Sequence, residues 1–170
     1  MKTLLTIGGV EIHHRESDES DISTHYEIVR FTSNLDICND GCGPSYGDPH
    51  YQPKTAYYNS GKYLNADVDK YIVIPPQIRS MVKGVVMGCQ ARLTNLETNV
   101  ECPAVVGEIG PKNKTGEASY CLAKIINPSI THNSGDKRRI YLYEFWPGIP
   151  AVVGEKTYKL EPARKRKPKS

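Results

Sequence analysis

The sequence predicts a mainly β protein with one or two helices, in which short strands close into a β-barrel. The chain of 170 residues contains many short segments rich in β-branched and aromatic residues, which is typical of strands. Its 14 glycines and 12 prolines favour frequent turns over long helices. One segment alone spaces its apolar residues as a helix does, so a closed β-rich architecture is expected.

Seven segments are expected to form strands, because each is short and holds closely spaced β-branched or aromatic residues. Residues 94–99 form a polar connection typical of a hairpin, so the strands on either side of them are expected to pair antiparallel. In chain order the expected strands are residues 3–12, 26–32, 70–76, 83–93, 100–108, 138–146 and a short final segment, 156–160.

The helix is expected within residues 116–126, where Leu122, Ala123 and Ile126 follow helical spacing before Pro128. Residues 33–68 show little regular pattern, and a long irregular segment often carries function on a rigid scaffold. The tyrosines of this segment either offer ring faces to sugars or pack the loop; they are Tyr46, Tyr51, Tyr57, Tyr58 and Tyr63.

The charge pattern predicts one domain, residues 1–162, followed by a disordered basic tail, residues 163–170. The net charge of +3 includes five positive residues of the tail, so the rest of the chain carries −2. A like-charged, proline-containing run is typical of a solvated tail, and we expect it to aid solubility rather than bind nucleic acid. The mildly acidic domain suits a cationic partner.

Five cysteines, an odd number, define no disulfide framework, although one or two bridges are possible outside a cell. No stretch is long enough to span a membrane, and the first ten residues resemble a strand more than a signal peptide. We therefore expect no membrane partner, and export through a removed signal or lysis. The glycosylation sequon at residues 113–115 favours a bacterial or viral source, because a glycan there would obstruct the segment between Glu108 and Glu117.

Glu108 and Glu117 are the candidate catalytic pair. Glu108 ends an expected strand and Glu117 opens the expected helix, and the Gly/Pro/Lys-rich residues between them turn the chain back. Both carboxylates can then face one cleft, which suits glycoside hydrolysis by an acid and a base. In the expected helix, the dipole would favour an ionised Glu117. The alternative is two surface charges flanking a turn.

Metal sites are not expected. Asp36, Cys38 and Asp40 follow part of a calcium-loop template, but cysteine is a poor ligand for calcium and position twelve is Gly47. An Asx-type turn explains this segment better. Cys38, Cys42 and His50 lack a fourth ligand for zinc.

Several blocks of the chain resemble glycoside hydrolase family 75, the chitosanases. "AVVGEIGPKNKTGEASYCLA", residues 104–123, is similar to the family signature, which has Asp at the position of Glu108. "DICNDG", residues 36–41, resembles its Asp-rich segment. Residues 47–76 are similar to its central region, and "IYLYEFWPGIP", residues 140–150, to its closing strand. The resemblance covers residues 34–150 in the family's order.

The resemblance implies endo-hydrolysis of β-1,4-linked glucosamine polymers with inversion and without a cofactor, and a double-psi-like barrel. Glu108 and Glu117 take the catalytic positions, with the longer Glu108 as the departure. The implied substrate-binding residues are Asp36, Asp40, Gln52 and Thr55. The expected partner is a cationic polysaccharide and the expected state is a monomer. The alternatives are a peptidoglycan hydrolase and an inactive glycan-binding module.

Overall fold

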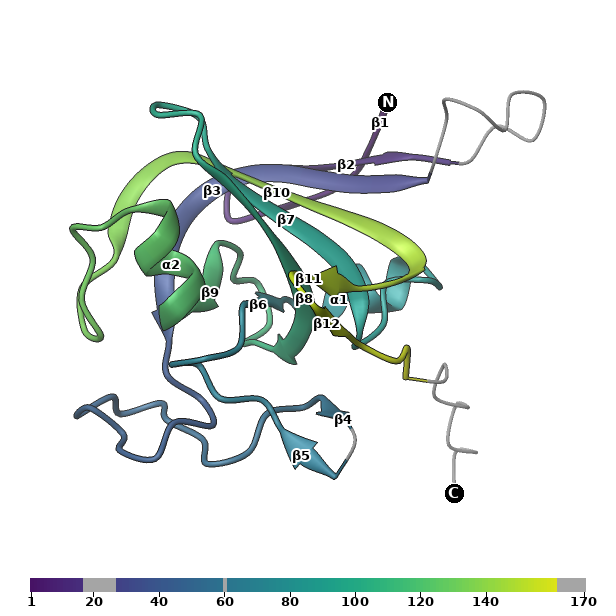
Figure 1. Cartoon of the computed structure of the whole chain (residues 1–170). Coiled ribbons are helices and arrows are strands. Elements are labelled where there is room, and N and C mark those ends of the chain that lie inside the picture. The colour runs from purple at the N-terminus through teal and green to yellow at the C-terminus, as the bar shows by residue number, and fades with distance from the viewer. Residues whose placement is uncertain (17–26, 60, 162–170) are drawn as a thin grey trace, which may run out of the picture.

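The computed structural model describes residues 1–16, 27–59 and 61–161, so the predicted tail, residues 163–170, lies outside the described residues. These residues form two helices and twelve strands (Figure 1). The helices are α1 (Pro76–Met81) and α2 (Tyr120–Ile126). The strands are β1 (Lys2–Ile7), β2 (Val10–Arg15), β3 (Ile28–Cys38), β4 (Tyr58–Asn59), β5 (Lys62–Tyr63), β6 (Tyr71–Ile74), β7 (Cys89–Asn95), β8 (Glu101–Ile109), β9 (Glu117–Ser119), β10 (Asp136–Pro150), β11 (Val152–Val153) and β12 (Lys156–Thr157).

Six strands close into a barrel. They hydrogen-bond in the order β3, β10, β7, β8, β6 and β9, and β9 pairs back with β3. Two of these pairs, β3–β9 and β6–β8, are parallel, and the others are antiparallel. The prediction of a mainly β chain with a β-barrel is therefore confirmed, as is the antiparallel pairing of the strands around residues 94–99. The double-psi arrangement stays a prediction.

The first expected strand, residues 3–12, is wrong as a single element, because it forms the hairpin of β1 and β2. Gly8 and Gly9 have φ of 54° and 78°, and a pair of left-handed residues makes the tight turn that suits a two-residue hairpin. The hairpin continues the sheet beyond the barrel, because β2 pairs with the start of β3. In Figure 1 it runs along the top of the view.

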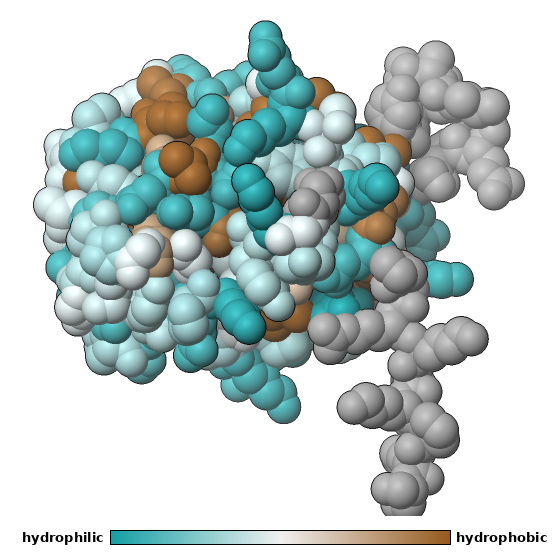
Figure 2. Space-filling view, turned by 60° about the horizontal axis from the view of Figure 1, so that its bottom comes forward, coloured by the Kyte–Doolittle hydropathy of each residue, from teal (hydrophilic) through white to brown (hydrophobic). Residues whose placement is uncertain are grey.

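The segment expected to be irregular from residue 33 begins later than predicted. β3 continues to Cys38, because its inward residues, such as Phe31 and Leu35, alternate into the core. Residues 39–70 are irregular apart from the small β4–β5 hairpin, and Figure 1 shows them below β6 and β9. Figure 2 turns this side of the molecule toward the viewer, and hydrophobic side chains form only small patches on its mostly hydrophilic surface.

The helix prediction is correct in place but begins too early. α2 begins at Tyr120, whereas Glu117 lies on β9, paired on one side with β3 and on the other with β6. The expected dipole effect on Glu117 is therefore wrong, since Glu117 is not in the first turn of the helix. No helix of the described residues is long and apolar enough to cross a membrane.

Candidate active site

Four residues on adjacent barrel strands form one row. Asp36 on β3 pairs with Glu117 on β9, and Glu117 pairs with Val73 on β6. Val73 pairs in turn with Glu108 on β8. Directly opposed residues project from the same face of a sheet. The two predicted catalytic glutamates therefore stand level with each other on strands that flank β6.

The strand spacing sets the separation of the two glutamates. Neighbouring strands lie about 4.8 Å apart, so two spacings place the α-carbons of Glu108 and Glu117 roughly 10 Å from each other. Gly110 packs beside this gap: a β-carbon added there would lie 2.9 Å from Val73 Cγ1 and 3.4 Å from Glu117 Oε2. A side chain at this position would therefore crowd the space beside Glu117.

Both glutamates line one pocket of about 550 Å³. Its walls come from the end of β3, the irregular segment after it, β6, the end of β8, the start of β9 and the segment between β8 and β9. The lining residues are Ile37, Cys38, Asp40, Asp48, Pro49, His50, Gln52, Val73, Glu108, Ile109, Gly110, Pro111, Lys114 and Glu117. The structure thus brings together two segments about seventy residues apart in the sequence.

Glu108 is a buried carboxyl group, 7% exposed. Its Oε1 accepts hydrogen bonds from the backbone N–H groups of Ala56, at 2.9 Å, and Ile109, at 3.0 Å. Burial, followed by the hydrogen bond with the Asp40 side chain, raises the pKa of Glu108 from 4.5 to about 8, although the two N–H donors oppose the rise. At neutral pH this carboxyl group can therefore donate a proton.

Glu117 is also largely buried, but a lysine accompanies it. Its side chain is 17% exposed, and Lys114 Nζ lies 3.9 Å from Glu117 Oε2 and 3.1 Å from Asp36 Oδ2. Burial raises the pKa of Glu117 from 4.5 to about 7, and the positive charge of Lys114 opposes this rise. Glu117 is thus the more readily ionised of the two glutamates.

The predicted substrate-binding residues divide into three groups. Asp40 and Gln52 line the pocket, and the Asp40 carboxylate also accepts the Gln52 backbone N–H at 2.8 Å. Asp36 lines a smaller adjoining cavity instead. Thr55 is buried, 4% exposed, and does not line either cavity. Its hydroxyl donates to Tyr57 O and accepts from Leu64 N, so it holds the irregular segment together.

Sequence reasoning missed two residues beside the predicted pair. Lys114 faces both Asp36 and Glu117, yet no motif distinguishes it from a solvent-facing lysine. His132 lines the adjoining cavity with its ring stacked between Tyr46 and Tyr120, at centroid distances of 3.5 Å to each. Only the fold could reveal this stack, since its three members come from separate segments.

The tyrosines of the irregular segment have different roles. Tyr57 is buried and donates to Lys159 O, and Tyr46 donates to Asp67 Oδ2, so these two pack and bond within the domain. Tyr58 and Tyr63 are exposed, with ring centroids 4.9 Å apart. Neither exposed ring lines the pocket of the two glutamates.

Within residues 1–16, 27–59 and 61–161, no group of three His, Cys, Asp or Glu side chains is arranged to hold a metal ion. The calcium-like segment is used differently, because Asp40 contacts Glu108 and the Gln52 backbone. No disulfide forms, since every cysteine of the chain is free: Cys38, Cys42, Cys89, Cys102 and Cys121.

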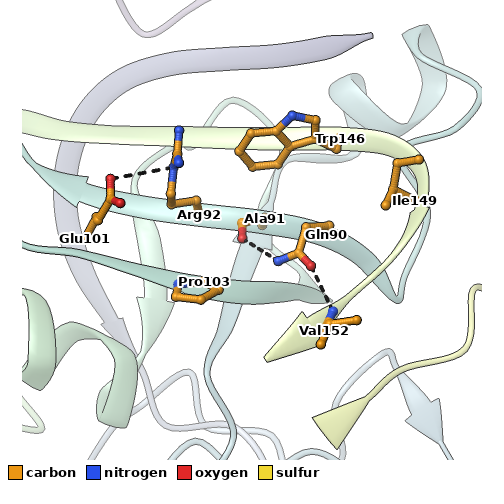
Figure 3. A pocket seen from close by; sticks show the side chains of 8 residues that line it. All are labelled: Gln90, Ala91, Arg92, Glu101, Pro103, Trp146, Ile149 and Val152. Atoms are coloured by element: carbon orange, nitrogen blue, oxygen red, sulfur yellow. Dashed lines mark hydrogen bonds and ion pairs between the residues drawn. The ribbon is translucent and has the colours of Figure 1, made fainter. Parts of the chain in front are cut away.

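A separate cavity of about 580 Å³ lies on the outer face of β7, β8 and β10 (Figure 3). Trp146, the single tryptophan, lines it beside Arg92, whose guanidinium carbon is 5.2 Å from the ring centroid. Arg92 also donates to Glu144 Oε1 at 2.8 Å. None of the predicted site residues lines this cavity.

Comparison of the sequence with protein-family models finds no matching family, and comparison with curated proteins finds no match. What the fold and site define is a closed six-stranded β-barrel with two largely buried glutamates in one pocket.

Proposed function

We propose that the chain is a glycoside hydrolase that cleaves β-1,4-linked glucosamine polymers with inversion. The observation that carries this proposal is the placement of Glu108 and Glu117 on the two strands that flank Val73, with both side chains in one pocket. Inverting glycosidases hold their two carboxyl groups about 6.5–9.5 Å apart, and two side chains that enter one pocket from α-carbons roughly 10 Å apart are compatible with such a separation.

The two environments assign the roles of acid and base. Glu108, with a pKa of about 8 and Asp40 beside it, keeps its proton at neutral pH and donates it to the glycosidic oxygen as the C–O bond breaks. Glu117, with a pKa of about 7 and Lys114 nearby, takes a proton from the water that attacks the anomeric carbon from the opposite face. Proton exchange with solvent then restores both groups.

The substrate class follows from charge and from the family resemblance. Asp36, Asp40 and Asp48 lie in or beside the pocket, which suits a polymer that carries protonated amines. The segments that resemble the chitosanases of family 75 supply both glutamates, as well as Asp40 and Gln52. Neither step of this mechanism requires a cofactor. Because no family model matches, the proposal depends on these short segments and on the pocket.

The direct test is reducing-end release from chitosan by the full chain and by Glu108→Gln and Glu117→Gln. We expect each substitution to lower kcat by at least about 10²-fold, because each removes a proton-transfer group. The wild-type kcat/KM should be greatest between about pH 7 and pH 8, where Glu117 is ionised and Glu108 protonated. Full activity of Glu117→Gln would refute the proposal.

A second substrate separates the two roles. A glucosamine oligomer with fluoride as its leaving group needs no acid, so Glu108→Gln should cleave it while Glu117→Gln should not. Parallel assays on chitin and purified cell walls test the peptidoglycan alternative. Binding of chitosan without release of product would instead support an inactive glycan-binding module.

A further inference from the structure

Residues 43–50, which we call the strap, form part of the wall of the pocket of the two glutamates. Six of these eight residues are exposed to solvent, and the strap lines the pocket through Asp48, Pro49 and His50. Both glutamates are largely buried. Access to their carboxyl groups therefore depends on the position of walls such as the strap.

Tyr46 attaches the strap to the rest of the domain by three contacts. Its ring stacks on the ring of His132, with centroids 3.5 Å apart and planes 9° apart. Its hydroxyl donates to Asp67 Oδ2 at 2.7 Å, and its carbonyl oxygen accepts a hydrogen bond from Asn133 Nδ2 at 2.9 Å. His132 and Asn133 lie between α2 and β10, so these contacts fasten the strap to a segment that is far away in the sequence.

The His132 side chain is itself held in place. Its ring also stacks on Tyr120, the first residue of α2, with centroids 3.5 Å apart. Its Nδ1 lies 3.0 Å from Asn39 Oδ1, and its carbonyl oxygen accepts Asn39 Nδ2 at 2.8 Å. Asn39 is 1% exposed. His132 is therefore a firm point of attachment for the strap.

The backbone of Tyr46 is strained while these contacts are made. Its φ of 55° lies in the left-handed region, which a residue with a bulky side chain rarely adopts. A β-carbon added at Gly43 or Gly47 would meet nothing within 4 Å, so there is open space beside the strap at both positions. Release of the Tyr46 contacts would thus relieve strain, and these two glycines have no close neighbours to oppose the movement.

We propose that the strap is a movable wall of the pocket, which closes when Tyr46 stacks on His132 and opens when this stack is released. In the closed position, Asp48, Pro49 and His50 border the pocket and Tyr46 is strained. In the open position these residues move away and Tyr46 relaxes, so the relief of strain offsets the lost stacking. The inference concerns access to the pocket and does not depend on which polymer the glutamates cleave.

Two buried cysteines can report the movement of the strap. Cys38 lines the pocket and is 4% exposed, so its thiol should become accessible when the strap opens. Cys89, on β7, is 0% exposed and does not line the pocket, so it reports unfolding of the whole domain. Alkylation of the full chain by iodoacetamide at pH 8, followed by mass spectrometry, measures the rate at each cysteine.

Three variants are compared with the wild-type chain. His132→Ala removes the ring stack and should accelerate alkylation of Cys38 by about tenfold, because one aromatic contact of this kind changes an equilibrium by roughly two- to tenfold. Asn133→Ala removes only the bond to the Tyr46 carbonyl oxygen and should accelerate it at least about twofold. His13→Ala, which removes a histidine of β2 outside the strap, is the control and should leave the rate unchanged.

The pattern of rates decides the inference. Faster alkylation of Cys38 with an unchanged rate at Cys89 would support a movable strap, whether or not the wild-type chain cleaves chitosan. An unchanged rate at Cys38 would overturn it, and so would equal acceleration at both cysteines, because the domain would then unfold as a whole. Asn133 is exposed, so its replacement decides the question even if His132→Ala does not fold.

Discussion

The replacement of Glu108 by glutamine should make the domain more stable at alkaline pH. Glutamine keeps the shape of the protonated side chain, can accept the N–H groups of Ala56 and Ile109, and can donate to Asp40. In the wild-type chain the folded state holds a proton on Glu108 that the unfolded state has released, because the pKa is about 8 in the fold and 4.5 as its usual value. The contribution of Glu108 to stability is therefore fully present below pH 4.5 and is lost as the pH rises to about 8.

The size of this effect follows from the pH range between the pKa of Glu108 in the unfolded chain and its pKa in the folded chain. One proton is worth about 1.4 kcal/mol per pH unit, so a window of about 3.5 units corresponds to about 5 kcal/mol from Glu108. A domain of this size has a total stability of about 5–15 kcal/mol, and Glu117 contributes in the same direction over a narrower window. Between pH 5 and pH 8 the free energy of unfolding of the wild-type chain should decrease, and we expect Glu108→Gln to reduce this decrease by at least about 2 kcal/mol.

Urea unfolding measures this effect at pH 5, 6, 7 and 8. The fluorescence of Trp146 reports it, since this is the single tryptophan and it lies on β10 of the barrel. Glu155→Gln, an exposed glutamate, should show the same dependence on pH as the wild-type chain. Equal losses of stability by Glu108→Gln and the wild-type chain between pH 5 and pH 8 would refute this prediction.

Two further changes test the scaffold. Gly116→Ala should destabilise the domain by about 2 kcal/mol or more, because Gly116 has a φ of +86° and an added β-carbon would lie 2.5 Å from Asn34 O. Gly43→Ala, where nothing lies within 4 Å, should be nearly neutral in the same urea assay, and equal losses would contradict this account. Burial raises the pKa of all five cysteine thiols, so a thiol-specific disulfide reagent at pH 8 should react only slowly with the folded chain. After unfolding, the same reagent should react with all five thiols. A rapidly reacting thiol in the folded chain would contradict this prediction.

Local patterns predicted most strands, but not how far they extend or how they pair. Residues 100–108 become β8 almost as expected, because its inward side chains are a dense apolar run. The first hairpin was missed because Gly8 and Gly9 are small enough to belong to either a strand or a turn. The closure of the barrel depends on β9, which is only three residues long, and no periodicity can be read from so short a strand.

The two glutamates of the candidate site could be proposed from the sequence, but the pocket they share could not. The motif around Glu108 and Glu117 identified both, whereas their level positions arise from the pairing of each with Val73. Thr55 matched the family pattern, yet its hydroxyl is used by the backbone of its own segment.

The chain has glutamate at position 108, where the family it resembles has aspartate, and the surrounding backbone accommodates this longer side chain. β8 and β6 shift register between Ile72 and Val73, so that Gly107 is passed over and Glu108 stands opposite Val73. A β-carbon on Gly107 would lie 2.4 Å from a Leu64 methyl group and 2.8 Å from Tyr71 Cβ, so any side chain at position 107 would clash. From there the longer side chain reaches the Ala56 N–H on the irregular segment. An aspartate would be shorter by one methylene and would leave the Ala56 N–H without its acceptor. The backbone position of Ala56 therefore requires glutamate, rather than aspartate, at position 108.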